Sequence, residues 1–161
     1  MKELLIINTG GTFNKIYNPL TGTLDIDKKG EAIKSIAKHW LTSFKIINIL
    51  GKDSLDINDK DREEIIKTIK AYFEKTVIII HGTDTINITA KVLYEADLEK
   101  EIILTGAMVP YSIDPIEATA NLASAYGYIN SIDKSGIFIA MNGVIKDYTS
   151  VIKNKEKGYF E

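Results

Sequence analysis

The stretch VIIIHGTDT, residues 77–85, decides the fold prediction because it joins a run of branched apolar residues to a polar, glycine-containing turn. Such a run favours a short strand that is buried on both faces. Helical spacing follows at once, since Ile86, Ala90 and Leu93 recur at intervals of four and three residues. A buried strand followed by an amphipathic helix is the repeating unit of a parallel sheet.

The same alternation continues along most of the chain. Further short apolar runs, rich in isoleucine, occupy residues 4–8, 44–50, 101–104 and 136–141. Helical patterns cover residues 31–40 and 58–73, and a further helix opens at Asp114 with a proline in its first position. We therefore predict an α/β fold of three layers, in which helices cover both faces of a mostly parallel, Rossmann-like or flavodoxin-like sheet.

The composition is that of an ordinary globular domain, with 161 residues, 45% hydrophobic and 26% charged. The chain has no cysteine, which excludes disulfides, thiolate metal sites and a catalytic thiol. The apolar run at residues 4–7 is too short for a signal peptide, and no run approaches the roughly 20 residues that span a bilayer. We expect a cytoplasmic protein. A net charge of -2 with a single arginine, Arg62, argues against nucleic acid as the main ligand.

Small polar residues gather directly after three of the predicted strands. The three segments are NTGGT at residues 8–12, HGTDT at 81–85 and TGAM at 105–108. Ligands of a parallel sheet bind beyond the carboxyl ends of its strands, near the point where strand order reverses, so we expect these loops to share one site. Glycines there allow close backbone approach and oxyanion-stabilising N–H groups, and a threonine hydroxyl beside them is a candidate nucleophile.

A threonine nucleophile needs a base to accept its proton, and the sequence offers two kinds. His39 falls on a predicted surface helix, and His81 ends a buried strand, where we expect a structural residue with satisfied hydrogen bonds. A lysine whose pKa falls on burial is the other candidate, but the chain has many lysines of equal chemistry. Motifs for phosphate loops, dinucleotides and serine-hydrolase elbows are absent. The residue types thus predict a hydrolase, without singling out its base.

Three of these loop sequences, TGGTF at residues 9–13, HGTDT at 81–85 and LTGAM at 104–108, resemble in order and content the bacterial-type L-asparaginase and glutaminase family. The resemblance implies that Thr12 is the nucleophile that forms an acyl-enzyme with the side-chain amide of the substrate. It also implies that Thr83 and Asp84 are the family's second threonine and its neighbouring aspartate, which also binds the α-ammonium group.

The resemblance extends to the end of the chain. Met141-Asn142 followed by Val151-Ile152-Lys153 is similar to the segment that carries the family's activating lysine. Lys153 is thereby the expected proton acceptor, in an arrangement with Thr83 and Asp84. The polar composition of residues 146–161 alone predicts a frayed tail, and the resemblance replaces that expectation with a functional segment.

The resemblance also implies the positions that contact the substrate. Asp53 and Ser54 are similar to a family segment that holds the α-carboxylate and amino group. Tyr17 is similar to a catalytic loop tyrosine that closes over the site and supports Thr12. The expected substrate-binding positions are Gly11, Asp53, Ser54, Gly82, Asp84 and Ala107. No cofactor and no metal is implied.

Family members usually carry a second, smaller α/β domain. We therefore expect residues 1–161 to form a single asparaginase-like N-terminal domain without the smaller C-terminal one. We expect a homo-oligomer, or a partner protein that supplies the rest. The expected reaction is hydrolysis of L-asparagine to L-aspartate and ammonia through a threonine nucleophile, with glutamine as a second candidate substrate. Two alternatives stay open: a weakly active or inactive domain that binds an amino acid or a partner protein, and an amidase subunit of a tRNA-dependent amidotransferase assembly.

Overall fold

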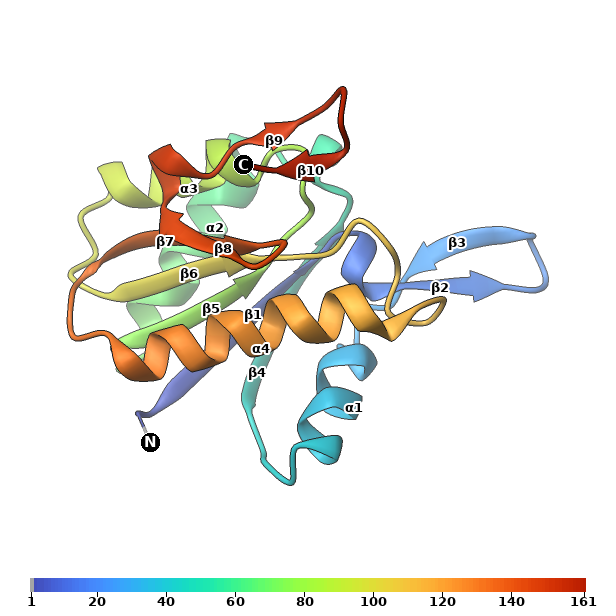
Figure 1. The fold of residues 1–161 in the computed structure, drawn as a ribbon, viewed down its shortest axis with the longest axis horizontal. Coiled ribbons are helices and arrows are strands. Elements are labelled where there is room, and N and C mark those ends of the chain that lie inside the picture. The colour runs from blue at the N-terminus through green and yellow to red at the C-terminus, as the bar shows by residue number, and fades with distance from the viewer. Residues whose placement is uncertain (1) are drawn as a thin grey trace.

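The computed structural model describes residues 2–161 as one central sheet between two helical layers (Figure 1). Its strands are β1 (Leu4–Gly10), β4 (Lys45–Lys52), β5 (Thr76–Ile80), β6 (Glu101–Thr105), β7 (Gly136–Met141) and β8 (Val144–Asp147). The spatial order is β4-β1-β5-β6-β7-β8, and every neighbouring pair is parallel except β7 with β8. Counted along the chain, the parallel strands lie in the order 2-1-3-4-5, which is the flavodoxin-like order. The predicted fold class is confirmed.

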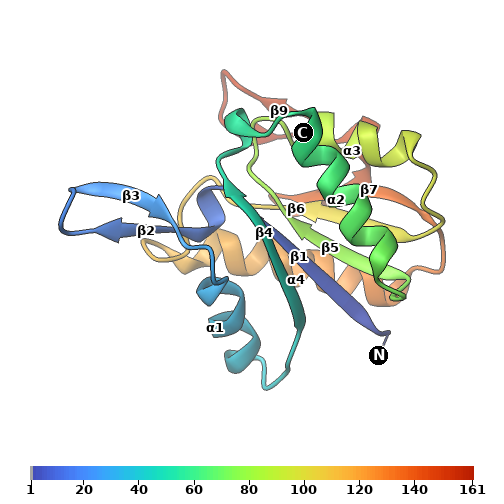
Figure 2. The same cartoon turned by 180° about the vertical axis from the view of Figure 1, so that it is seen from behind.

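Two helices cover each face of the sheet (Figures 1 and 2). They are α2 (Asp59–Ala71) and α3 (Ile86–Glu95) on one face, and α1 (Glu31–His39) and α4 (Pro115–Ser131) on the other. Neighbouring strand residues point to opposite faces, so Ile79 packs with α2 and α3 whereas Ile78 packs with α1 and α4. Because both faces are covered, the inner strands β1, β5, β6 and β7 carry runs of buried apolar residues.

The helix starts use the capping signals that the sequence carries. The Asn58 side chain accepts a hydrogen bond from the Asp61 backbone N–H, and the Asp61 carboxylate accepts one from the Asn58 backbone N–H, which makes a reciprocal cap for α2. At α4, the Asp114 carboxylate accepts from the Ile116 N–H at 3.0 Å. These caps explain why the predicted helices begin within a residue or two of the observed ones.

The antiparallel edge strand β8, two hairpins outside the central sheet and three short 3-10 turns were not predicted. The first hairpin, β2 (Lys15–Asn18) with β3 (Thr23–Ile26), projects from the body of the molecule (Figure 1). The second joins β9 (Lys153–Asn154) and β10 (Tyr159–Phe160) at the end of the chain. The turns are η1 (Thr12–Asn14), η2 (Ser54–Asp56) and η3 (Tyr148–Ser150). Of the helices in residues 2–161, none is long and apolar enough to cross a membrane.

The last residues of the chain are ordered against the core, so the frayed tail that composition alone predicts is wrong. Val151 and Phe160 are buried in the same hydrophobic cluster as α2 and α3. The backbones of Ile152 and Glu161 exchange hydrogen bonds of 2.8 and 3.0 Å. Two apolar anchors outweigh the polar composition of the segment between them.

We predict that Phe160→Ala lowers the free energy of unfolding by about 3 kcal/mol, because it deletes a ring that is only 2% exposed. Urea denaturation measures this change. Tyr159→Ala is the matched control, since its ring is 41% exposed, and should cost less than about 1 kcal/mol. Equal costs for the two substitutions would contradict a buried anchor at Phe160.

Candidate active site

Three loops meet in backbone contact at the carboxyl edge of the sheet. A Cβ added to Gly11 would lie 2.7 Å from the backbone of Gly82, and one added to Gly82 would lie 2.6 Å from Cβ of Ser54. Gly11 also has a φ of +73°, a conformation that favours glycine. The contact lies between β1 and β5, at the point where the strand order reverses, which is where the sequence placed the site.

An irregularity in β4 brings Asp53 and Ser54 to this point. The pairing of β1 with β4 shifts between Asn8 and Gly10, and Gly10 then lies opposite Lys52. Leu50 and Gly51 adopt left-handed backbone conformations there, with φ of 61° and 62°. The Gly11 N–H donates to the Lys52 carbonyl at 2.9 Å, and this hydrogen bond stabilises the shifted pairing.

The threonines of the three loops differ in what their hydroxyls do. Three of them donate to main-chain carbonyls: Thr9 to Ile80 at 2.8 Å, Thr105 to Ala140 at 2.7 Å, and Thr85 to Ser54 at 2.8 Å. These hydroxyls stabilise the strand ends and the loop contact. The hydroxyl of Thr12 is bound to no group within residues 2–161, and its residue is half-buried in η1. It is therefore available to a ligand.

Thr83, the second candidate threonine, has two ionisable neighbours. It is 7% exposed, and its Oγ1 lies 2.9 Å from Nζ of Lys153. The same Nζ lies 2.7 Å from Oδ1 of Asp84. Lys153 is 70 residues from Thr83 and 69 from Asp84 in the sequence, and the terminal hairpin brings it next to both. The structure thus brings together the hydroxyl, amine and carboxylate that the resemblance predicted.

Two asparagines that the sequence analysis missed hold the segment that carries Lys153. Asn87, in the first turn of α3, donates from Nδ2 to the carbonyls of Val151 at 2.7 Å and Tyr148 at 3.1 Å. Asn142 accepts from the Phe160 N–H at 3.1 Å, and Phe160 pairs directly with Lys153. Asn142 follows Met141 in the quoted motif, so its position in that motif was a signal that could have indicated this role.

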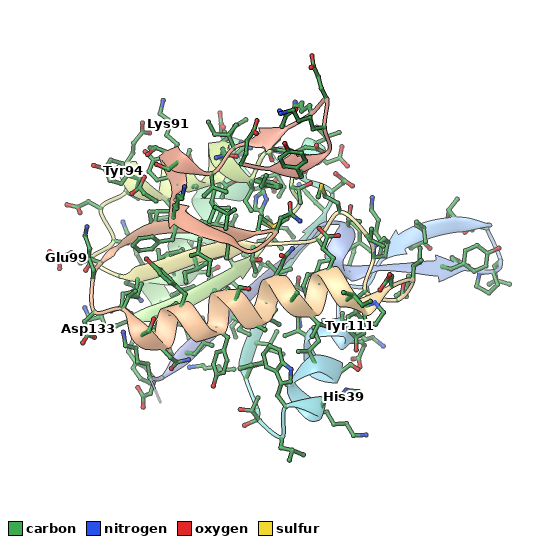
Figure 3. The ribbon with its side chains drawn as sticks, in the orientation of Figure 1. His39, Lys91, Tyr94, Glu99, Tyr111 and Asp133 are labelled. Carbon is green, nitrogen blue, oxygen red and sulfur yellow. The ribbon has the colours of Figure 1, made fainter. Side chains whose placement is uncertain are left out.

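His81 is structural, as the sequence analysis expected. Its Nδ1–H donates to the Gly82 carbonyl at 2.7 Å, and its Nε2 accepts from the Thr89 hydroxyl at 2.8 Å. Burial lowers the pKa of His81 to about 4, and the nearby charge of Arg62 acts in the same direction. The other histidine, His39, is exposed on α1, as predicted (Figure 3).

The remaining predicted site residues lie at different depths. Ser54 is buried, and its Oγ accepts from the Asp84 N–H at 3.2 Å. Asp53 pairs with Lys15 at 2.8 Å, and this hydrogen bond holds the pKa of the Asp53 carboxyl below its ordinary value. Ala107 is fully buried within the core cluster of α1 and α4, which leaves only its backbone for a substrate. Tyr17 is 63% exposed on β2, and its closure over the site stays a prediction.

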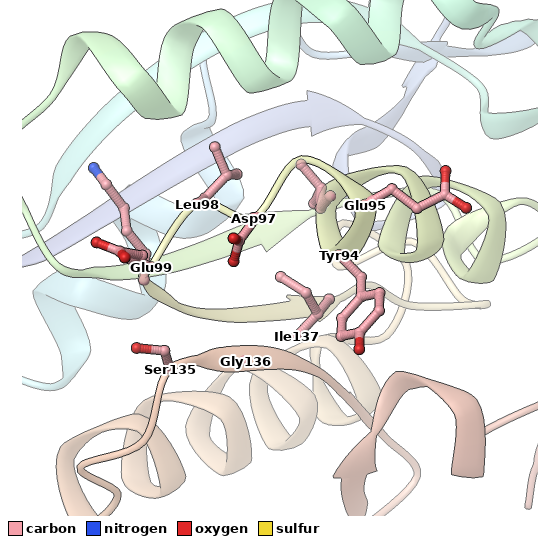
Figure 4. A pocket seen from close by; sticks show the side chains of 10 residues that line it. Tyr94, Glu95, Asp97, Leu98, Glu99, Ser135, Gly136 and Ile137 are labelled. Atoms are coloured by element: carbon pink, nitrogen blue, oxygen red, sulfur yellow. The ribbon is translucent and has the colours of Figure 1, made fainter.

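The hollow of about 500 Å³ shown in Figure 4 lies at the opposite, amino edge of the sheet. Leu98, Glu99 and Ser135, which line it, precede β6 and β7. It shares no residue with the three loops described above. Within residues 2–161 no group of three or more histidine, aspartate or glutamate side chains is arranged to hold a metal ion.

A family model described as the N-terminal part of asparaginase matches residues 3–159. The chain belongs to the asparaginase family. The resemblance that the three loop motifs predicted is thereby confirmed.

Figure 3 shows Tyr111 near the start of α4, close to the base of the projecting hairpin, where its hydroxyl forms a hydrogen bond with Ser35 Oγ at 2.9 Å. This contact ties α1 to the loop that follows the third asparaginase motif.

Individual relatives of this asparaginase-family chain span two kinds of protein. The chain is 32% identical to a glutamyl-tRNA(Gln) amidotransferase subunit of Nanoarchaeum equitans, over 92% of this chain and 39% of that protein. It is 29% identical to L-asparaginase 1 of Escherichia coli K12, over 96% of this chain and 45% of that protein. The structure of the thermostable L-asparaginase from Thermococcus kodakarensis superposes with a TM-score of 0.82 at 26% identity, over 100% of this chain and 51% of that chain. The chain therefore spans about half, or less, of the length of these relatives.

We predict that the buried, neutral His81 makes stability depend on pH. Its folded-state pKa of about 4 lies below the ordinary 6.5, so the unfolded chain binds the proton first. The contribution of His81 is complete above pH 6.5 and is lost as the pH falls toward 4, by about 3 kcal/mol in all.

The measurement is the free energy of unfolding in urea between pH 7 and about pH 4.5. His81→Asn, whose amide can still donate to the Gly82 carbonyl, should remove about 2 to 3 kcal/mol of the loss seen in the unaltered chain over this window. His39→Gln, at an exposed position, is the control and should keep the original pH dependence. An unchanged slope in His81→Asn would contradict a neutral buried imidazole.

Proposed function

We propose that the chain is an amidohydrolase that converts L-asparagine to L-aspartate and ammonia through a threonine nucleophile. The observation that carries the proposal is the Thr83, Lys153 and Asp84 cluster, with contacts of 2.9 and 2.7 Å, beside a Thr12 hydroxyl that no group within residues 2–161 binds. A nucleophile, a basic group and a carboxylate that orients it are the parts that acyl transfer requires.

In the proposed reaction, Oγ1 of Thr12 attacks the side-chain amide carbon of asparagine. The carbon becomes tetrahedral, ammonia leaves with a transferred proton, and the acyl group stays on Thr12 as an ester. Water then hydrolyses the ester and restores the hydroxyl. Lys153, in its amine form, accepts the proton that passes through Thr83 and returns it to the leaving group, while Asp84 balances the charge that the lysine gains.

The oxyanion of the tetrahedral intermediate needs donors that are already in place. The backbones of Gly11 and Gly82 meet at the site, at a separation that leaves no room for a Cβ on either residue. We assign oxyanion stabilisation to N–H groups of these two loops. Local pairs, and not the net charge of the chain, then recognise the small zwitterionic amide. The cysteine-free composition suits the reducing cytoplasm, where we place this activity.

A second candidate is the amidase component of an amidotransferase assembly. It is favoured by the 32% identity to the glutamyl-tRNA(Gln) amidotransferase protein of Nanoarchaeum equitans. In such an assembly the same threonine chemistry would release ammonia for another protein. Asparagine and glutamine differ by one methylene, which changes selectivity by about 1 to 3 kcal/mol, so both amides belong in the assay.

We predict that the purified chain releases ammonia from asparagine and that Thr12→Ala, Thr83→Val and Lys153→Met each lower kcat/KM by about a thousandfold or more. These substitutions remove the nucleophile, its partner hydroxyl and the proton acceptor. A coupled assay for ammonia measures the loss. Thr149→Val and Lys155→Met are matched controls at exposed positions and should leave the activity unchanged.

Other results would favour the alternatives. Ammonia release that needs an added protein extract, and that is still lost in Thr12→Ala, would support a role within an amidotransferase. No release under any condition, together with a melting temperature raised by aspartate, would support an amino-acid-binding domain and contradict the hydrolase. Equal activity in the chain and in Thr12→Ala would rule out the proposed nucleophile.

We also propose that the chain forms a homo-oligomer. The projecting hairpin exposes the apolar side chains Ile16, Tyr17, Leu20 and Leu24, with Leu20 94% exposed. Four exposed apolar side chains on one projecting hairpin favour a contact surface there. Sedimentation equilibrium at roughly tens of micromolar should therefore give a mass of two chains or more, and Leu20→Lys with Leu24→Lys should shift it toward one chain. A single-chain mass for the unaltered protein would contradict the proposal.

A further inference from the structure

Three buried side chains form a row of hydrogen bonds that runs from α2 through α3 to the loop that carries Thr83. Nε of Arg62 donates to Oγ1 of Thr89 at 3.2 Å, and this oxygen lies 2.8 Å from Nε2 of His81. Nδ1 of His81 lies 2.7 Å from the Gly82 carbonyl. Thr89 and His81 are fully buried, and the Arg62 side chain is 7% exposed. We call these three side chains the relay.

The chemistry of Arg62 fixes the direction of every hydrogen bond in the relay. A guanidinium group carries donors only, so Oγ1 of Thr89 accepts from Arg62. The single hydrogen of the Thr89 hydroxyl is then left for Nε2 of His81, which is the acceptor. His81 is neutral at pH 7 because burial lowers its pKa to about 4, and a neutral imidazole carries one ring hydrogen. That hydrogen is therefore on Nδ1, which donates to the Gly82 carbonyl.

A carbonyl held in this way also orients the next N–H group of the loop. The peptide between Gly82 and Thr83 is trans, so the Thr83 N–H points to the side opposite the carbonyl, away from the buried His81 ring. Thr83 is 7% exposed, and its N–H has no acceptor among residues 2–161. Buried backbone N–H groups are nearly always paired. This one is suited to an acceptor that comes from outside the chain.

The burial of Arg62 is unexpected if the relay serves packing alone. Arg62 is the only arginine of the chain, and its charge pairs at 3.2 Å with Asp59, whose side chain is 96% exposed. Removing a guanidinium from water costs free energy that one contact with an exposed carboxylate offsets poorly. An apolar side chain could join α2 to α3 without that cost. What the guanidinium adds is a group that can only donate, which fixes the orientation of the Thr89 hydroxyl.

We propose that Arg62, Thr89 and His81 are positioning residues that present the Thr83 N–H to the oxyanion of the tetrahedral intermediate. The inference rests on the proposed function, because it names one oxyanion donor and its support at the same site. The relay does not contact the substrate. It fixes the peptide plane before the reaction, so the N–H need not reorient as negative charge develops. With the ring hydrogen on Nε2, His81 would leave the Gly82 carbonyl without its donor.

The kinetic test removes the Thr89 hydroxyl and keeps the shape of the side chain. Thr89→Val should lower kcat for asparagine about 10- to 100-fold and change KM by less than about threefold, because a transition-state donor is displaced while ground-state contacts remain. Thr89→Ser keeps the hydroxyl and should recover kcat to within about threefold. Thr68→Val is the matched control, since Thr68 is 8% exposed on α2 and donates to the Glu64 carbonyl. Unchanged kcat in Thr89→Val, or an equal fall in Thr68→Val, would overturn the inference.

Nitrogen NMR tests the relay without requiring activity. In the unaltered chain at pH 7, isotope-labelled His81 should carry its hydrogen on Nδ1, and His39→Gln assigns the signal of the other histidine. L-Aspartate, whose β-carboxylate supplies an oxygen acceptor, should shift the Thr83 N–H resonance in the unaltered chain and in Thr89→Ser. The shift in Thr89→Val should be about half as large or less, as expected for a displaced donor.

These measurements separate the inference from the proposed reaction. If the unaltered chain releases no ammonia, the proposed hydrolysis fails, and the NMR results still decide the role of the relay. The hydrogen on Nε2 in the unaltered chain, no aspartate-induced shift of the Thr83 resonance there, or an equal shift in Thr89→Val would overturn it. The first two measurements need no variant, so they also decide the case in which Thr89→Val does not fold.

Discussion

The close contact between the backbones of Gly11 and Gly82 is the constraint on which the site depends. Beyond β1 the chain passes through the hairpin to α1 on one face of the sheet, whereas beyond β5 it passes directly to α3 on the other face. The two loops therefore diverge, and their glycines meet at a separation that leaves no room for a Cβ. Thr12 and Thr83 each follow one of these glycines, so the contact places both threonines at the same rim.

Hydrogen bonding then divides the polar residues of the rim into structural and chemically available groups. The hydroxyls of Thr9, Thr85 and Thr105 each donate to a carbonyl of a neighbouring segment, which satisfies buried backbone groups at the strand ends. Freeing such a hydroxyl would cost the hydrogen bond that it makes to this carbonyl. The hydroxyls of Thr12 and Thr83 donate to no backbone carbonyl within residues 2–161. The sequence does not reveal which hydroxyls are committed in this way, because all five threonines lie beside glycines or aspartates.

The fold could be predicted from the sequence, because strands that are buried on both faces appear as short apolar runs. The candidate site could be predicted only in part. The loop glycines and threonines follow their strands directly, so position in the chain indicates position in space. The left-handed conformation of Leu50 was missed, since it follows from pairing with β1 and not from local preference. Lys153 was selected by the family resemblance, because its place depends on residues about 70 positions earlier and many lysines share its chemistry. The ion pair of Lys15 with Asp53 was not predicted, because it depends on a hairpin whose strands are too short and too polar to show a period of two.

The proposed proton acceptor, Lys153, lies on the terminal hairpin, so its position depends on how that hairpin packs against the core. His81, at the end of a strand, is fixed by the sheet itself. His81 lies at the centre of the sheet edge, but burial keeps it neutral and out of reach of a substrate, and both of its ring nitrogens are already hydrogen-bonded. Lys153 is instead partly exposed and contacts both Thr83 and Asp84. Its position is fixed by Phe160, which pairs with it across the hairpin and is buried in the core. The geometry of the proposed proton acceptor therefore depends on hydrophobic burial on the strand opposite it, away from the threonine it serves.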